Sequence, residues 1–119
     1  MYLYNKRFHL IKAFFGDGAS VAYVNFNGTN DSIRESRRVS SITDLGSEDY
    51  RINFSSSMPN SNFQWAGAGG RAGGDGNSWV GEVITERNTN RIRTRWMDNS
   101  ATRRTPTQAM CIFTTNDFT

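Results

Sequence analysis

The segment DYRINFS, residues 49–55, decides the fold class. Its large apolar side chains, Tyr50, Ile52 and Phe54, fall at every second position, and polar residues fill the positions between them. Successive side chains of a β-strand point to opposite faces of the sheet. This period of two therefore predicts a strand with one face in a core and the other toward solvent.

Segments of the same kind lie on both sides of residues 49–55 and are bounded by turn residues such as the Asn27-Gly28 pair. They are 20–26, 32–45 (one bent strand or two short ones), 63–68, 78–86, 90–97 and 108–115. About seven or eight short strands at this spacing are typical of a sandwich or barrel. We expect an all-β fold, an antiparallel β-sandwich or jelly-roll-like domain over residues 16–119, preceded by an arm over residues 1–15.

The composition predicts one domain with a thin, aromatic-rich core. Leu, Ile, Val and Phe together supply only 23 of the 119 residues, whereas aromatic residues make up 13% of the chain. Chains with so few aliphatic residues are often disordered, but those chains also carry a high net charge, and here it is only +3. We interpret the thin core as a hint that neighbouring copies of the chain contribute burial.

The segment NRIRTRWM, residues 90–97, carries arginine at every second position: Arg91, Arg93 and Arg95. In a half-buried strand the outward face is wet, and arginine is common there. The same row is a candidate inter-subunit strand face, which would pair with carboxylates of a neighbouring copy or with acidic sugars. Sequence alone leaves these interpretations open.

Nucleic-acid binding ranks below both interpretations of this row. Single-strand binders place aromatic side chains among the basic ones, but Trp96 alternates with the arginines and so points to the opposite face. The sequence also contains no recognisable recognition helix for double-stranded DNA. Arg103 and Arg104, in the polar loop 98–107, are expected to extend the row and to make outward contacts.

Glycine dominates the segment GAGGRAGGDGN, residues 67–77. A phosphate-binding P-loop requires a Gly-Lys-Ser/Thr ending, and no lysine follows Lys12. We therefore predict a loop whose glycines permit positive φ angles or close backbone packing. Its polar residues Arg71, Asp75 and Asn77 are candidates for outward contacts.

Catalytic, cofactor and metal sites are not predicted. His9 is the single histidine and Cys111 the single cysteine, so neither a zinc site nor a disulfide framework can be assembled. Cys111 lies in an apolar strand and is expected to be an inert buried thiol. Paired carboxylates for glycoside cleavage remain an alternative, with Glu82 and Glu86 or Asp44 and Asp49 as the pairs.

The tryptophans Trp65, Trp79 and Trp96 allow two interpretations. They form either a platform for sugar stacking or part of the core, and we favour the core because each side chain buries a large area.

The first fifteen residues, MYLYNKRFHLIKAFF, are aromatic and basic. Charged and polar residues interrupt their apolar stretch, so they resemble neither a signal peptide nor a membrane span of about 18 apolar residues. We predict a docking arm that uses Tyr4, Phe8, Phe14 and Phe15.

Four motifs between residues 21 and 69 occur in a characteristic order. They are YVNFNGT (23–29), VSSIT (39–43), DYRINF (49–54) and the corner formed by Met58-Pro59 with Asn62-Phe63. In this order they resemble a β module that is common in tailed bacteriophages, often as the distal part of a tail fibre or a related virion protein. The RIRTR strand and the apolar closing strand resemble the end of that module.

The resemblance implies a non-enzymatic virion structural protein, a small tail-fibre-type component on the external surface of the phage particle that contributes to host attachment. It also implies a homotrimer, with other tail or capsid proteins as partners and a host-surface glycan as a further partner. No nucleic acid and no membrane insertion are expected. The alternatives are a capsid decoration, cement or head-fibre protein, a free carbohydrate-binding module, and a small glycosidase.

Overall fold

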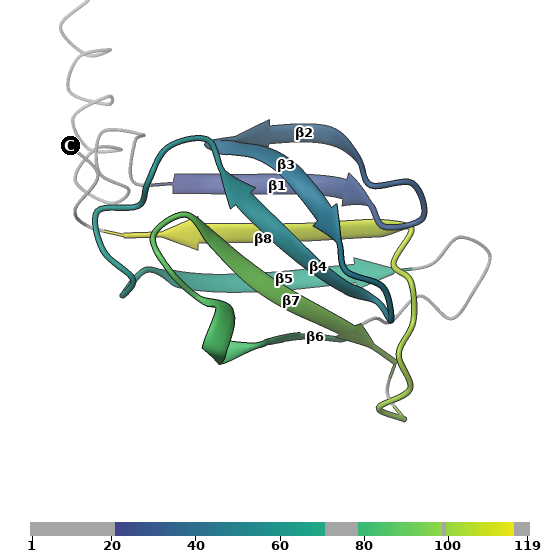
Figure 1. The fold of residues 1–119 in the computed structure, drawn as a ribbon. Coiled ribbons are helices and arrows are strands. Elements are labelled where there is room, and N and C mark those ends of the chain that lie inside the picture. The colour runs from purple at the N-terminus through teal and green to yellow at the C-terminus, as the bar shows by residue number, and fades with distance from the viewer. Residues whose placement is uncertain (1–20, 71–78, 99, 116–119) are drawn as a thin grey trace, which may run out of the picture.

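A computed structural model describes residues 21–70, 79–98 and 100–115 of the chain. These residues form eight strands and one short 3₁₀ turn (Figure 1). In chain order they are β1 (Val21–Asn27), β2 (Ser32–Arg37), β3 (Val39–Asp44), β4 (Asp49–Phe54), β5 (Gln64–Gly70), β6 (Trp79–Glu82), η1 (Ile84–Glu86), β7 (Arg91–Met97) and β8 (Gln108–Thr114). The expected arm over residues 1–15 lies outside the described residues.

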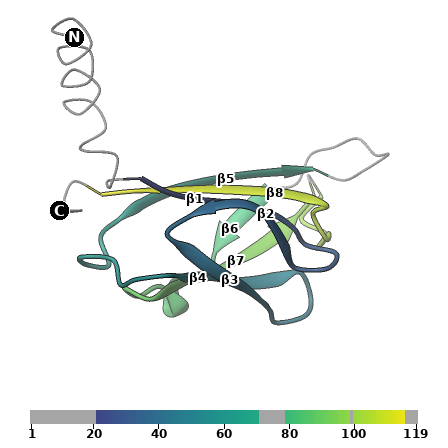
Figure 2. The same ribbon diagram turned by 90° about the horizontal axis from the view of Figure 1, so that it is seen from above.

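The strands form two antiparallel four-stranded sheets. The first sheet has the order β2-β1-β8-β5 and the second has the order β3-β4-β7-β6. Figure 2 shows them as two layers packed face to face. The predicted β-sandwich is therefore confirmed.

Residues 32–45 form two strands in different sheets rather than one bent strand. Arg38 separates β2 from β3 and has a φ angle of 61°. This left-handed conformation, which is uncommon for a residue with a Cβ atom, redirects the chain from one sheet to the other.

The predicted alternation places the core between the sheets. Tyr50, Ile52 and Phe54 of β4 are buried, as expected from the segment 49–55. β7 and β8 alternate in the same way, with Trp96 and Phe113 fully buried. Aromatic rings in this core meet edge to face, as in the pairs Phe26–Tyr50, Phe26–Trp96, Phe54–Phe63 and Phe54–Phe113.

The buried apolar residues connect into one cluster that spans both sheets. Its members, among the described residues, are Ala22, Val24, Phe26, Val39, Tyr50, Ile52, Phe54, Met58, Phe63, Ile92, Trp96, Ala109, Cys111 and Phe113. A single chain thus closes its own interior, despite its small number of aliphatic residues. Any argument for association between copies must therefore rest on the outer faces of the sheets.

The glycine-rich segment 67–77 is not a loop from its start, because β5 continues through Gly70. Gly67 and Gly69 lie on the inward side of this strand, where a Cβ atom would come within 2.6 Å of Val80 Cγ1 and of Trp96 Cζ3, respectively. Because Gly67 and Gly69 have no side chain, they leave room in the core for Val80 and Trp96 of the facing sheet.

The predicted strand 78–86 is also shorter than expected. β6 ends at Glu82, and the chain then turns through η1. The backbone N–H of Val83 still donates to the carbonyl of Arg93, at 3.0 Å, so the turn stays attached to β7. This attachment places Glu86 beside the outer face of the second sheet.

Candidate functional site

The outer face of the second sheet carries the arginine row. Along β7 the arginines are exposed or half-buried, while Ile92, Thr94 and Trp96 are buried. The alternation expected for residues 90–97 is therefore correct. In the antiparallel register Arg91 lies opposite Asn53, Arg93 opposite Arg51, and Arg95 opposite Asp49.

Asp49 organises this face. Its side chain is only 2% exposed, and it accepts from Arg93 and Arg95 together. Arg95 donates from Nε to Oδ1 at 2.9 Å and from Nη2 to Oδ2 at 3.0 Å. Arg93 donates to Oδ2 from Nη2 at 2.6 Å and from Nε at 3.2 Å. The carboxylate thus holds two guanidinium planes in fixed positions.

Electrostatics keep this buried carboxyl group ionised. Burial by itself raises the pKa of Asp49, but hydrogen bonds from Arg95 and Arg93 outweigh that effect and leave the pKa below its ordinary value. Both arginines have a raised pKa, chiefly because they donate to Asp49. The cluster therefore stays charged over the whole physiological range.

Glu86 is the second carboxylate of this face. It accepts from Arg51 at 3.0 Å and lies 3.2 Å from Nη1 of Arg93. The hydrogen bond from Arg51 is the main reason that the pKa of Glu86 is lowered. Arg51 and Arg93 are directly opposed like charges, an arrangement that destabilises a strand pair on its own, and Glu86 offsets their repulsion.

Of the two loop arginines predicted to extend the row, one does. Nη1 of Arg103 lies 3.7 Å from Oδ1 of Asp49 and donates to the carbonyl of Ser47. Arg104 instead pairs with Asp98, at 2.9 Å. Both arginine side chains are well exposed, with 39% and 43% of their surface accessible.

We call this cluster the arginine face and define it as Arg51, Arg91, Arg93, Arg95 and Arg103 with Asp49 and Glu86. Five guanidinium groups against two carboxylates leave a formal excess of three positive charges. Sequence reasoning identified most of the arginines but missed the two acids as their partners. The alternation of residues 49–54 could have identified Asp49 as a partner, because it places Asp49 on the same outward side of β4 as Arg51.

The carboxylates considered for glycoside cleavage are all engaged elsewhere. Asp49 and Glu86 belong to the arginine face, and Asp44 accepts from the backbone N–H of Gly46 at 2.7 Å. Glu82 pairs with Arg87 at 2.8 Å and accepts from the indole N–H of Trp65 at 3.0 Å. For Asp49 and Glu86, whose pKa is lowered, these contacts favour the ionised form, which has no proton to donate as a general acid.

The tryptophans and the cysteine divide between core and periphery. Trp96 is fully buried, in agreement with the core interpretation, while Trp65 is only partly buried and packs against the core. The side chain of Trp79 lies outside the described residues. Cys111 is buried, as expected, and burial raises the pKa of its thiol to about 12.

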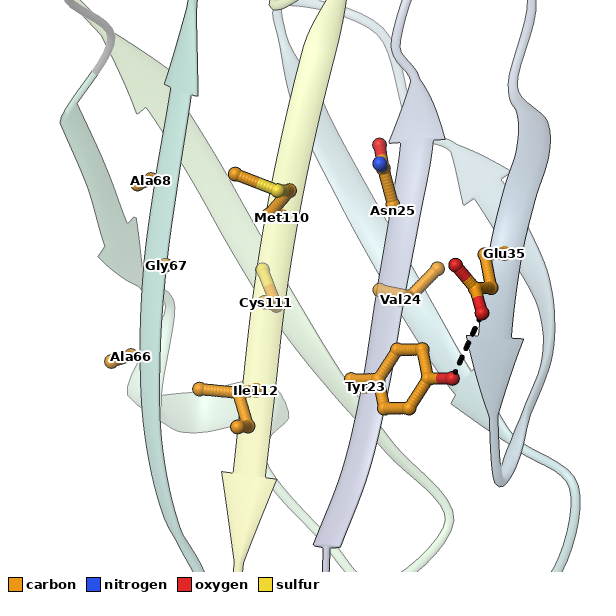
Figure 3. Close-up of a pocket in the computed structure, with 10 residues that line it drawn as sticks. All are labelled: Tyr23, Val24, Asn25, Glu35, Ala66, Gly67, Ala68, Met110, Cys111 and Ile112. Carbon is orange, nitrogen blue, oxygen red and sulfur yellow. Dashed lines mark hydrogen bonds between the residues drawn. The ribbon is translucent and has the colours of Figure 1, made fainter.

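A shallow apolar groove of about 420 Å³ lies on the outer face of the first sheet. Met110 and Ile112 project from β8 and are 50% and 46% exposed. Figure 3 shows them between the alanines of β5 and the side chains of β1, with Tyr23 donating to Glu35 at one border. We call this surface the apolar face and define it as Tyr23, Asn25, Ala66, Ala68, Met110 and Ile112.

Several predicted contact residues lie outside the described residues. They are Tyr4, Phe8, Phe14 and Phe15 of the arm and Arg71, Asp75 and Asn77 of the glycine-rich segment. Within the described ranges, no group of three or more His, Cys, Asp or Glu side chains is arranged to hold a metal ion. The same ranges contain no helix long and apolar enough to cross a bilayer.

Comparison with known proteins gives one informative match. No protein-family model matches the sequence, and no curated protein is significantly similar to it. Among solved structures, the fold is similar to part of the phiAB6 tailspike, which was crystallised in complex with three-repeated oligosaccharides of Acinetobacter baumannii surface polysaccharide. The TM-score is 0.58 at 13% sequence identity, over 84% of this chain and 22% of the tailspike chain. The likeness therefore concerns the fold and spans about a fifth of the tailspike.

Proposed function

We propose that the chain is a non-enzymatic structural protein of a bacteriophage particle, a small tail-fibre-type component on the external surface that contributes to host attachment. The observation that carries this proposal is the fold, a β-sandwich similar to one part of a phage tailspike. The four ordered motifs between residues 21 and 69 support the same assignment independently of the fold.

The described surfaces support binding rather than catalysis. The candidate acids are occupied by arginines, an indole N–H or a backbone N–H. The groove on the first sheet is shallow, and its carboxylate, Glu35, accepts from Tyr23. A glycosidase needs two carboxyl groups that face each other across a substrate, with one of them protonated.

We propose that copies of the chain associate, as a homotrimer, through the apolar face. Met110 and Ile112 lie next to each other along β8 with no described side chain covering them. Small alanines on β5 leave the surface flat enough for a neighbouring copy to approach closely. Three copies on one rigid assembly would present three weak binding sites together, which raises the effective concentration of each site.

The proposal is tested by locating the protein in purified phage particles. Immunogold labelling of intact particles with an antibody against the folded domain is expected to mark the tail. Labelling of the head would assign the protein to capsid decoration instead. Absence of the protein from particles, measured by mass spectrometry of purified virions, would contradict any virion role.

Attachment is tested separately with the isolated protein. Added in excess to host cells, it is expected to slow phage adsorption, because it occupies the same surface glycan. The matched control is the same protein after heat denaturation, added at equal concentration. An unchanged adsorption rate at saturating protein would remove the attachment role.

A further inference from the structure

We propose that the arginine face is a binding site for an anionic polysaccharide, one whose sugars carry carboxylate or phosphate groups. This inference rests on the proposed attachment function and specifies the chemistry of the ligand. The ligand class follows from the donors on this face, because guanidinium groups bind carboxylate and phosphate through paired N–H donors.

The guanidinium groups of Arg93 and Arg95 are held in place before any ligand arrives. Arg93 donates to Asp49 and lies against Glu86, so one residue links both carboxylates. Arg95 is fixed by two hydrogen bonds to Asp49. Ordering long side chains on binding lowers affinity, and a face that is already ordered avoids much of that loss.

The same contacts leave donors available. Arginine has five N–H groups, and Arg95 uses Nε and Nη2 toward Asp49, which leaves Nη1. Arg91 lies at the exposed start of β7, and Arg103 uses Nη1 toward the Ser47 carbonyl and Asp49 while its side chain stays 39% exposed. The two carboxylates are therefore satisfied, while the cations in excess face solvent.

The shape of the face favours an extended polymer over a small molecule. The arginines stand on a β-sheet surface, and alternate residues of a strand are about 6.8 Å apart. Along β7 this gives three cations in a line, with Arg103 beside the end that carries Arg95. A chain of acidic sugars can contact such a line at several points, each of them weak.

Nucleic acid is the competing polyanion. Proteins that track a nucleic-acid backbone place it in a continuous basic groove with aromatic rings for the bases. None of the residues that define the arginine face is aromatic, and Trp96 is fully buried on the inner side of β7, so the face offers DNA bases no ring to stack on. We therefore expect single-stranded DNA to bind more weakly than an acidic glycan of equal charge.

The test uses the full chain and oligogalacturonate as the probe, with methyl-esterified oligogalacturonate as a control that keeps the sugar backbone and removes the charge. A phosphate-bearing glycan, phosphomannan, forms the second arm. Titration calorimetry is expected to show binding of at least one anionic probe and none of the esterified one. Equal binding of the esterified probe, no binding of either anionic probe, or equal binding of DNA would overturn the proposal.

The test variant is the double substitution Arg91→Gln and Arg103→Gln, which spares the arginines that neutralise Asp49 most closely. It is expected to lower affinity about tenfold, as the loss of two exposed charge contacts implies. The control is Arg37→Gln, an exposed arginine of β2 in the other sheet. Equal loss in the control, or none in the double variant, would assign the binding to overall charge rather than to the arginine face.

Failure of this inference is distinguishable from failure of the proposed function. A protein that is present in virions but binds neither anionic probe keeps its virion role and loses this ligand class. A protein that binds the probes through the arginine face but is absent from virions keeps the site and loses the virion role. Thermal unfolding of each variant verifies that the fold is intact before its binding is interpreted.

Discussion

At the scale of single residues, Asp49 has the largest influence on the outer surface. It is an acid on the outward side of a strand, a position that normally faces water, yet it is almost completely buried beneath arginine side chains. Removing one member of a buried ion pair is costly, because the remaining charges lose their partner. The arginines here are partly exposed, so water can compensate for some of that loss.

We expect Asp49→Ala to lower the free energy of unfolding by about 2–4 kcal/mol, a large effect for an outward-facing position. Urea denaturation followed by tryptophan fluorescence measures it. Glu35→Ala is the control, because Glu35 is exposed and accepts a single 3.3 Å hydrogen bond from Tyr23, and it should cost less than about 1 kcal/mol. Equal effects of the two substitutions would contradict the organising role of Asp49.

The same residue predicts a pH dependence. The pKa of Asp49 is lowered in the folded state, so its contribution to stability is fully present above the ordinary Asp pKa of about 3.9 and is lost as the pH falls through the lower folded-state value. The stability difference between the wild type and Asp49→Asn should therefore be constant near neutral pH and shrink below about pH 4. Unfolding midpoints measured between pH 2 and pH 7 test this; a difference that grows with acid would contradict it.

The pKa of Cys111 is shifted upward on folding, whereas that of Asp49 is shifted downward. Burial raises the pKa of its thiol to about 12, whereas the unfolded thiol ionises near pH 8.5. Its contribution to stability is therefore fully present below about pH 8.5 and is lost as the pH rises toward 12.

We expect a thiol reagent to label the protein only after denaturant is added. Rapid labelling of the native protein at pH 8 would mean that the strand opens far more readily than its packing implies.

At the scale of elements, β5 shows why glycines occur in the middle of a strand. Gly69 faces the ring of Trp96, and a Cβ atom there would come within 2.6 Å of the ring atom Cζ3. Trp96 is fully buried and contacts Phe26 edge to face, so it has little room to move. The glycine thus determines how closely the two sheets approach at this position.

We expect Gly69→Ala to lower the free energy of unfolding by about 1–3 kcal/mol, because the added methyl group overpacks the core. Thermal unfolding and the tryptophan emission maximum are the measurements. Gln64→Ala is the matched control, on the solvent side of the same strand and outside the apolar face, and it should be nearly neutral. A stable Gly69→Ala variant would mean that Trp96 can shift.

The strands themselves could be predicted because their signal is local. Segment 49–55 alternates cleanly, and the structure buries Tyr50, Ile52 and Phe54. The extent of β5 was not predictable, because the reason for its glycines is Trp96, almost thirty residues away and in the other sheet. Pairing between strands is equally non-local, so the sequence indicated the arginine row but not the acids that hold it.

The two candidate surfaces also depend on non-local strand pairing, which the sequence does not reveal. The exposure of Met110 and Ile112 follows from alternation with Cys111 and Phe113, but a strand rich in apolar residues reads as core on both faces. Only the position of β8 within the first sheet shows that one of its faces is uncovered. The contact residues predicted in the arm and in the segment 71–78 lie outside the described residues and stay predictions.

At the scale of the whole molecule, the two outer faces differ in chemistry. One carries the arginine face and the other the apolar face, on opposite layers of the sandwich (Figure 2). A surface with adjacent half-exposed apolar residues is suited to packing against a protein, whereas an ordered set of cations is suited to an anionic ligand. This division allows copies to assemble through the first sheet while the second sheet stays accessible.

The double substitution Met110→Asp and Ile112→Asp is expected to convert an assembled protein into monomers, because burying two carboxylates between copies is unfavourable. Sedimentation velocity measures the mass, which should fall from that of three chains to the 13.4 kDa of one. Ile84→Asp is the control: Ile84 is 77% exposed and lies on η1, beside the second sheet, so its substitution should leave the mass unchanged. Because the core is complete within one chain, the monomeric variant should remain folded. A wild-type protein that is monomeric at micromolar concentration would contradict assembly through the apolar face. A monomeric variant that unfolds would contradict the claim that the core of one chain is sufficient for folding.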